Sequence, residues 1–552
     1  MDTAQRQTVE SQTEARTFKS CLAVGTAVKT ATEYSPRRGR MAVLTALLAL
    51  GFCALAKPDD KRIGESLRRI DGVVAQGPFR ASWESLETYK VPKWYLDAKF
   101  GIFIHWGVFA VSAYDDWYAR NMYLQDHRVF KHHVETYGPQ SRFGYKDFIP
   151  MFKAEKFDAN RWAELFREAG AKYVVPVAEH HDGFPMYDCS FTEWSATKMG
   201  PRRDIVAELA EAVRKQGLRF GASSHRAEHW WFFDGGMTFD SDVRDPRYAG
   251  LYGPAQPEKT QPDKAFLDDW LARTCEIVDK FEPDVVWFDW WIEQPVFRPY
   301  LQKFAAYYYN QAVQWKRGVV INYKNDAYPE RAAVLDLERG QLTTIRPLVW
   351  QTDTSVSKNS WFYTRDSDYK SLDSLIGDLV DIVSKNGVLL LNIGPKADGT
   401  IPAQEEDILK GIGQWLAVNG EAIYGTRPWK VFGEGPTEVV GGSFKDTARK
   451  PFTAGDIRFT AKGDTLYAIA LAWPEKGRLV VKSLATASSL SKREVKNVEL
   501  LGSKATVKWR RNAQGLTIET PARRPCEGAF VFRISPVGRA ARPDDLPRVS
   551  QE

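Results

Sequence analysis

The amino-acid sequence predicts an α/β fold, a (β/α)8-type barrel followed by a C-terminal antiparallel β-sandwich. From about residue 95 to 425, short apolar runs alternate with amphipathic helical patterns, which indicates a parallel sheet covered on both faces. A barrel is the leading arrangement for about 330 residues of this kind. After Trp429 the segments become short and alternating, and Gly or Pro turns separate them, as in a sandwich.

Six buried runs are the predicted barrel strands, because each is short and almost continuously hydrophobic. They are Phe100–Trp106, Tyr173–Glu179, Arg219–Ser224, Val285–Trp290, Gly318–Tyr323 and Val388–Pro395. Three helices between them have recognisable ends. One spans Arg161–Ala169 and stops at Gly170, while Asp204 and Ser374 are the expected N-caps of the other two.

Six further runs are the predicted sandwich strands. They are Asp456–Thr460, Thr465–Trp473, Leu479–Leu484, Thr506–Trp509, Leu516–Glu519 and Ala529–Ile534. The expected divisions are a leader at 1–56, an N-terminal linker at 57–90, the barrel at 91–428, the sandwich at 429–540 and a tail at 541–552.

The leader contains a predicted signal peptide at residues 41–56, MAVLTALLALGFCALA, which follows Arg37, Arg38 and Arg40. Its apolar run of about 15 residues is short for a membrane-spanning helix. We therefore expect a periplasmic or secreted protein without membrane insertion once the signal is removed. Residues 1–40 show no apolar pattern, and we interpret them as an over-extension of the reading frame upstream of Met41.

Composition narrows the function further. The net charge is +6 among 76 basic and 70 acidic residues, which are dispersed, so nucleic-acid binding has little support. The 19 Trp residues suit a carbohydrate binder, although a Trp-rich core explains them as well. Outside the leader, Cys189, Cys275 and Cys526 are an odd and sparse set, which argues against a disulfide scaffold.

Candidate functional residues lie at the C-terminal ends of the predicted strands, where barrel enzymes place their sites. Asp289 is flanked by aromatics at the end of a predicted buried strand, where a carboxylate needs a role or a partner such as Lys324 or Arg339. Adjacent strand residues face opposite ways, so only one of His180 and His181 enters the barrel unless the chain turns there. Metal ligation by this pair with His105 lacks a spaced carboxylate triad, and we predict neither metal nor cofactor.

Six motifs follow one another in order between about residues 90 and 430. They are Lys99–Gly107, Asp116–Tyr123, His180–Pro201, Trp287–Asp289, Trp350–Ser355, and Asn386–Gly399 with Asn419–Trp429. Together they resemble glycoside hydrolase family 29, the α-L-fucosidases. This resemblance implies a retaining exo-glycosidase that removes terminal α-L-fucosyl residues from oligosaccharides or polysaccharides. It also implies that Asp289 is the nucleophile.

The second carboxyl group varies in position across that family. Relatives often carry Glu after the residue matching Trp350, but here Gln351 has no titratable proton. Glu338 lies where some relatives carry their acid, so we predict it as the acid/base, with Asp353 next and a structural ion pair with a neighbouring arginine as the alternative. In retaining enzymes the two carboxyl groups lie about 5–5.5 Å apart.

The resemblance also implies the sugar contacts. These are His105, Asp116, Trp117, His180, His181, His225, Lys324 and Trp290. Asp116 replaces a usual Glu and Lys324 a usual Arg, which removes a bidentate fork. The usual pocket Tyr after the third strand is absent, and His225 or His229 is expected to fill its space. Of four rim candidates, Trp230, Trp231, Trp290 and Trp291, we expect two in the core.

Three alternatives stay open at this point. The missing Tyr leaves room for an α-L-galactosidase or an enzyme of relaxed specificity, since the two sugars differ by one hydroxyl at C6. A non-catalytic sugar-binding protein needs neither Asp289 nor Glu338 and is disfavoured for that reason. A metal-dependent hydrolase would be sensitive to chelators. The oligomeric state is not predicted.

Overall fold

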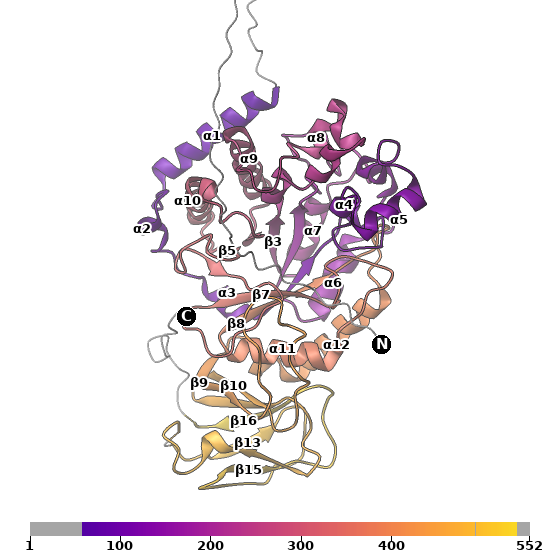
Figure 1. Cartoon of the computed structure of the whole chain (residues 1–552). Helices are drawn as coiled ribbons and strands as arrows, with labels where there is room; N and C mark the ends of the chain where they lie inside the picture. The colour runs from indigo at the N-terminus through magenta and orange to yellow at the C-terminus, as the bar shows by residue number, and fades with distance from the viewer. Residues whose placement is uncertain (1–57, 492, 538–552) are drawn as a thin grey trace, which may run out of the picture. The chain divides into compact units, whose positions relative to one another are not determined.

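A computed structural model describes residues 58–491 and 493–537 of the chain (Figure 1). The predicted leader, including the signal peptide and Met41, lies outside the described residues, as does the tail at 541–552. Within the described part, every helix is too short or too polar to cross a bilayer.

Eight parallel strands form one sheet in the order β6-β5-β4-β3-β2-β1-β8-β7. Their bounds are β1 Phe100–Ile104, β2 Tyr173–Glu179, β3 Arg219–Ser224, β4 Val285–Phe288, β5 Val320–Tyr323, β6 Val334–Leu335, β7 Trp350–Ser355 and β8 Gly387–Ile393. β6 and β7 meet at a parallel bridge between Asp336 and Gln351, where the Leu337 N–H donates to the Gln351 carbonyl at 2.9 Å. The sheet is therefore a nearly closed barrel, which confirms the predicted fold class.

Two of the three helices with predicted ends form close to their expected positions. They are α6 (Ala159–Glu168) and α7 (Ile205–Lys215), and the Asp204 carboxylate caps α7 by accepting the Ala207 N–H at 2.8 Å. The cap predicted for α11 (Leu372–Ser384) is wrong. Ser371 caps that helix, because its hydroxyl accepts the Ser374 N–H at 3.2 Å.

The N-terminal segment before the barrel contains helix α1 (Pro58–Gln76), which packs against α9 (Lys264–Phe281) and α10 (Arg298–Gln314) (Figure 1). Ile70 is fully buried in that contact, and Arg69 donates to the Tyr307 hydroxyl at 3.1 Å. The remaining α-helices are α2 Trp83–Leu86, α3 Lys93–Ala98, α4 Tyr118–Asn121, α5 Arg128–Tyr137, α8 Ala249–Tyr252 and α12 Ala403–Asn419.

Two antiparallel sheets follow the barrel, as predicted. One has the order β13-β16-β11-β10-β9 and the other β12-β15-β14. Their bounds are β9 Arg427–Glu434, β10 Ile457–Lys462, β11 Thr465–Ala470, β12 Arg478–Val481, β13 Asn497–Leu500, β14 Trp509–Asn512, β15 Gly515–Glu519 and β16 Phe530–Ser535. α11 packs against β9 and β10, so this barrel helix joins the two parts.

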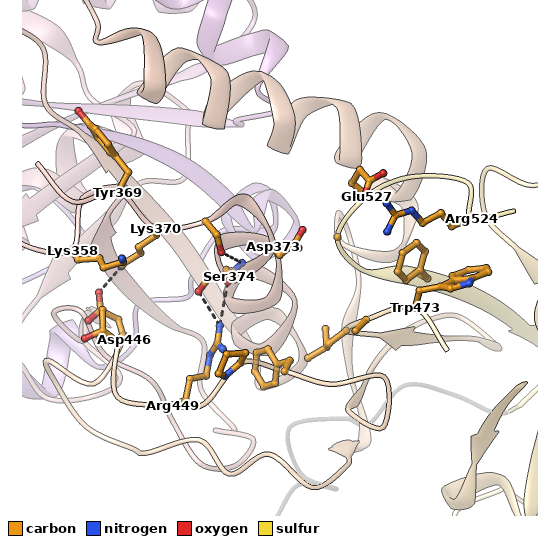
Figure 2. Close-up of a pocket in the computed structure, with 18 residues that line it drawn as sticks. Lys358, Tyr369, Lys370, Asp373, Ser374, Asp446, Arg449, Trp473, Arg524 and Glu527 are labelled. Carbon is orange, nitrogen blue, oxygen red and sulfur yellow. Dashed lines mark hydrogen bonds and ion pairs between the residues drawn. The ribbon is translucent and has the colours of Figure 1, made fainter. Parts of the chain in front are cut away.

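A pocket of about 670 Å³ lies where α11 meets the sandwich (Figure 2). Its polar side chains pair with one another. Lys370 contacts Asp446 at 2.6 Å and Arg449 donates to the Ser374 hydroxyl at 3.3 Å. Its lining contains none of the predicted site residues, so the functional site lies elsewhere.

Candidate active site

The chain turns directly after β2, and this turn brings two neighbouring histidines into one pocket. β2 ends at Glu179, and the Gly183 N–H then donates to the His180 carbonyl at 3.1 Å. Gly183 has φ +70°, a backbone conformation that favours glycine. A Cβ there would also lie 2.4 Å from the His229 ring, so a larger residue would not fit. His180 and His181 both line the pocket as a result, which the strand alternation alone would not allow.

Asp289 follows β4 immediately and is 8% exposed. Its carboxylate lies 3.0 Å from Lys324 Nζ, 2.8 Å from His225 Nδ1 and 3.6 Å from His181 Nε2. Burial by itself would raise the pKa of Asp289, but Lys324 and the two histidines outweigh it and hold that pKa well below its usual range. Asp289 is therefore an ionised, fixed carboxylate.

Glu338 follows β6 and contacts the same lysine, with 2.6 Å between Lys324 Nζ and Glu338 Oε2. Because Lys324 Nζ is also 3.0 Å from Asp289 Oδ1, those two oxygens are at most about 5.6 Å apart, the sum of the two distances. Burial raises the pKa of Glu338, and the charge of Asp289 raises it further against the opposing effect of Lys324. The two carboxyl groups thus have pKa values moved in opposite directions, as an acid and a nucleophile require.

β7 contributes inward side chains at two levels of the barrel. Gln351 is fully buried, and its amide oxygen accepts from the Tyr95 and Tyr173 hydroxyls at 2.8 and 2.7 Å. Asp353, two residues nearer the C-terminal end, lies 3.6 Å from Lys324 Nζ. Burial and the nearby Asp336 raise the pKa of Asp353 well above its usual range. Both acids considered from the sequence, Glu338 and Asp353, therefore reach the site.

The histidines of the site are held neutral. Burial is the main cause that lowers the pKa of His105, His180 and His181, and it lowers the pKa of His225 to about 4. Neutral imidazoles can donate and accept hydrogen bonds, which suits sugar hydroxyls. Asn392 fixes His105 by a contact of 2.7 Å between Oδ1 and Nδ1.

Two groups of these side chains have spacing that could hold a metal ion. In each group, His105, His180 and His225, or His181, His225 and Asp289, the potential ligand atoms lie within 4.8 Å of one another. Both ring nitrogens of His225, however, already have partners. They lie 2.8 Å from Asp289 and 3.0 Å from the Ser223 hydroxyl, so a metal would have to displace one of them.

The site consists of two spaces that share part of their lining. An inner chamber of about 40 Å³ is lined by His105, Trp117, His180, His181, Trp287, Asp289, Trp290, Lys324, Glu338, Asp353, Trp361 and Phe362. An outer chamber of about 650 Å³ is lined by Asp116, Trp117, Trp290, Lys324, Asn325, Leu335, Asp336, Leu337, Glu338, Trp361, Ser443 and Phe444. Glu338 lines both chambers, whereas Asp289 lines the inner one. Glu338, the candidate acid, therefore lies between the two chambers.

Two sequence expectations about the pocket wall are now resolved. Trp230, Trp231 and Trp291 are at most 5% exposed, so the expectation that two of the four tryptophans form a rim is wrong; Trp290 alone among the four lines the chambers. His225 fills the space beside Asp289. His229 instead lies 2.9 Å from the His181 carbonyl and supports the turn.

Sequence reasoning missed two residues that shape the site. Glu228, fully buried on the 3-10 helix after β3, has its carboxylate 3.4 Å from His181 Nδ1, on the ring edge opposite Asp289. Trp361 lies in the loop after β7, where its backbone N–H donates to the Asp116 carboxylate at 3.2 Å. The strand-end rule would have pointed to the loop of Trp361 had β7 been recognised. Glu228 follows the recognised β3 but lies on the 3-10 helix beyond its end.

Comparison with known proteins agrees with this geometry. The α-L-fucosidase family model matches residues 67–421, and the model of the α-L-fucosidase C-terminal domain matches residues 449–535. Tissue α-L-fucosidase of Homo sapiens is 32% identical, with 86% of this chain and 94% of that protein covered, and plasma α-L-fucosidase of Homo sapiens is 33% identical, with 83% and 93% covered. The crystal structure of Thermotoga maritima α-fucosidase superposes with a TM-score of 0.65 at 30% identity, covering 83% of this chain and 100% of that one. The resemblance inferred from the motifs is confirmed, and the chain belongs to the α-L-fucosidase family of glycoside hydrolases.

Proposed function

We propose that this α-L-fucosidase acts by a two-step retaining mechanism, with Asp289 as nucleophile and Glu338 as acid/base. The observation that carries this proposal is the contact of Lys324 with both carboxyl groups, which limits the distance between their nearest oxygens to about 5.6 Å, the sum of 3.0 and 2.6 Å. Retaining glycosidases place their carboxyl groups about 5–5.5 Å apart, and a wider gap is needed to admit the water of an inverting enzyme.

In the first step, the ionised Asp289 attacks the anomeric carbon and the bond to the leaving oxygen breaks. Glu338, protonated, gives its proton to that oxygen. In the second step, Glu338 takes a proton from water, the water oxygen bonds to the anomeric carbon, and Asp289 is released as a carboxylate. The opposite pKa directions of Asp289 and Glu338 prepare each group for its first role.

The substrate is a fucosylated oligosaccharide or polysaccharide, cleaved at its terminal sugar. His105, His180 and His181 line the inner chamber beside Asp289, where neutral imidazoles suit the hydroxyls of one terminal sugar. The Thermotoga maritima enzyme, 30% identical and with a TM-score of 0.64, has been solved with fucose bound.

The mechanism predicts distinct products in azide. Because it removes the covalent step, Asp289→Gly should lower kcat on p-nitrophenyl α-L-fucoside by several orders of magnitude. The fold should be kept. Added azide should restore turnover and yield β-L-fucosyl azide, whereas Glu338→Ala with azide should yield the α-anomer. Proton NMR of the products distinguishes them, and circular dichroism checks the fold.

The natural protein supplies the matching controls. Its first-formed fucose should keep the α configuration, and it should cleave the α-L-fucoside faster than the α-L-galactoside. An inverted first product, or full activity in Asp289→Gly, would contradict the assignment.

A further inference from the structure

One loop from the C-terminal part of the chain reaches back to the barrel. This crossing loop, residues 435–456, joins β9 to β10. Gly442 and Gln341 exchange two backbone hydrogen bonds of 2.9 and 3.2 Å. Beyond residue 444, the Asp446 carboxylate accepts from Lys370 at 2.6 Å (Figure 2) and from the Thr354 hydroxyl at 2.7 Å. The crossing loop is thus fixed to the barrel on both sides of residue 444.

Phe444, between these anchors, combines three unusual features. Its side chain is 62% exposed, although it is large and apolar. Its φ is +56°, a left-handed backbone conformation that is rare for a bulky residue. Its N–H donates at 2.8 Å to the carbonyl of Glu338, the acid/base. A strained backbone held in place by its surroundings points to a functional role.

The position of Phe444 identifies what its ring can contact. Phe444 lines the outer chamber together with Leu337, Trp290 and Glu338. A proton from Glu338 goes to the oxygen that joins fucose to its leaving group. With the anomeric carbon of fucose beside Asp289 and the leaving oxygen beside Glu338, the leaving group must therefore extend into the outer chamber. Aromatic rings bind such a group by stacking on its apolar face.

We propose that Phe444 is the platform that binds the leaving group, a pyranose or aryl ring attached to fucose. This inference rests on the proposed roles of Asp289 and Glu338. It assigns leaving-group selectivity to a residue that neither matched family range, 67–421 nor 449–535, includes.

The test compares two substrates whose first step needs no acid. 2-Chloro-4-nitrophenyl α-L-fucoside has a ring that reaches the outer chamber, whereas α-L-fucosyl fluoride has a leaving group of one atom. Phe444→Ala should lower kcat/KM on the aryl fucoside by about three- to tenfold, the range that aromatic stacking gives, and leave the fluoride unchanged. Phe444→Trp, which keeps an aromatic ring, should have the kcat/KM of the natural protein on the aryl fucoside.

Val440→Ala is the matched control, since Val440 is 44% exposed on the same loop and lies outside the lining of both chambers. It should change neither substrate. Equal losses of kcat/KM on both substrates in Phe444→Ala would show a general structural effect and overturn the proposal. Unchanged kcat/KM on both would overturn it as well, because the ring would then not touch the leaving group. A natural enzyme inactive on every α-L-fucoside would instead refute the function on which the inference rests.

Discussion

Lys324 couples the charges of the active site. Its ammonium lies 2.6 Å from Glu338, 3.0 Å from Asp289 and 3.6 Å from Asp353, so one buried cation faces three carboxyl groups. A lysine acts as a point charge and does not impose the planar fork of an arginine. It lowers the pKa of both Asp289 and Glu338, but burial prevails at Glu338 and raises the pKa there.

The pH dependence of kcat/KM should report these two groups. In the proposed mechanism activity needs Asp289 ionised and Glu338 protonated, so the acidic limb should reflect the lowered pKa of Asp289 and the alkaline limb the raised pKa of Glu338. Lys324→Met removes a cation that lowers both pKa values, so both limbs should move to higher pH. Lys358→Met, which removes an exposed lysine paired with Asp368, should leave the profile in place. An acidic limb unmoved in Lys324→Met would contradict this account.

Among the elements, apolar continuity predicted β1 to β5 and β8 but missed the two strands that close the barrel. β6 has only the residues Val334–Leu335, and no helix separates β5, β6 and β7. The sequence of β7 is polar because its inward residues Gln351 and Asp353 bind polar groups inside the barrel, namely Tyr173 and Lys324. The strand-end rule still brought Asp289 and Lys324 to the site, because both lie at the C-terminal ends of predicted strands.

The site residues that sequence reasoning missed lie in the connections between the strands. Trp361 follows the unrecognised β7, Glu228 lies on a short 3-10 helix, and Phe444 comes from a loop that begins in the sandwich. Their positions depend on contacts between residues far apart in sequence, such as Phe444 with Glu338, and local periodicity carries no signal for such contacts.

Two glycines inside helices should respond to the same substitution with opposite signs. A Cβ at Gly413 in α12 would lie 2.1 Å from the Glu168 carbonyl oxygen at the end of α6, whereas no atom lies within 4 Å of a Cβ at Gly72 in α1. Gly72→Ala should raise the free energy of unfolding by about 0.5–1 kcal/mol through helix propensity. Gly413→Ala should lower it by ~1–3 kcal/mol because the two helices cannot part freely. Urea unfolding measures both, and a stabilised Gly413→Ala would refute the close contact.

At the scale of the whole molecule, a buried ion cluster joins the barrel to the sandwich. Asp381 on α11 lies 2.5 Å from Arg458 Nε on β10 and 2.6 Å from Lys385 Nζ. These side chains are at most 2% exposed, so each charge needs its partners to compensate for the hydration that it loses on burial. The attachment of the sandwich therefore depends on complementary charge as well as on apolar packing.

Removing the cation from the sandwich side should be costly. Arg458→Met leaves Asp381 with less compensation and should lower the free energy of unfolding by about 3–5 kcal/mol. Arg493→Met breaks an exposed pair with Asp464 and should cost about 0–1 kcal/mol. Chemical denaturation followed by tryptophan fluorescence compares them, and similar small losses in both variants would show that the cluster contributes little.

The crossing loop has a consequence for how such enzymes diversify. The crossing loop, residues 435–456, follows β9 in the chain yet lines the outer chamber through Ser443 and Phe444. A recombination event at the end of the barrel would therefore also exchange part of the outer chamber. Under the roles proposed above, chimaeras joined near Trp429 would inherit their nucleophile from one parent and their preference for the leaving group from the other. Domain shuffling in this lineage could then alter selectivity without a single substitution in the barrel.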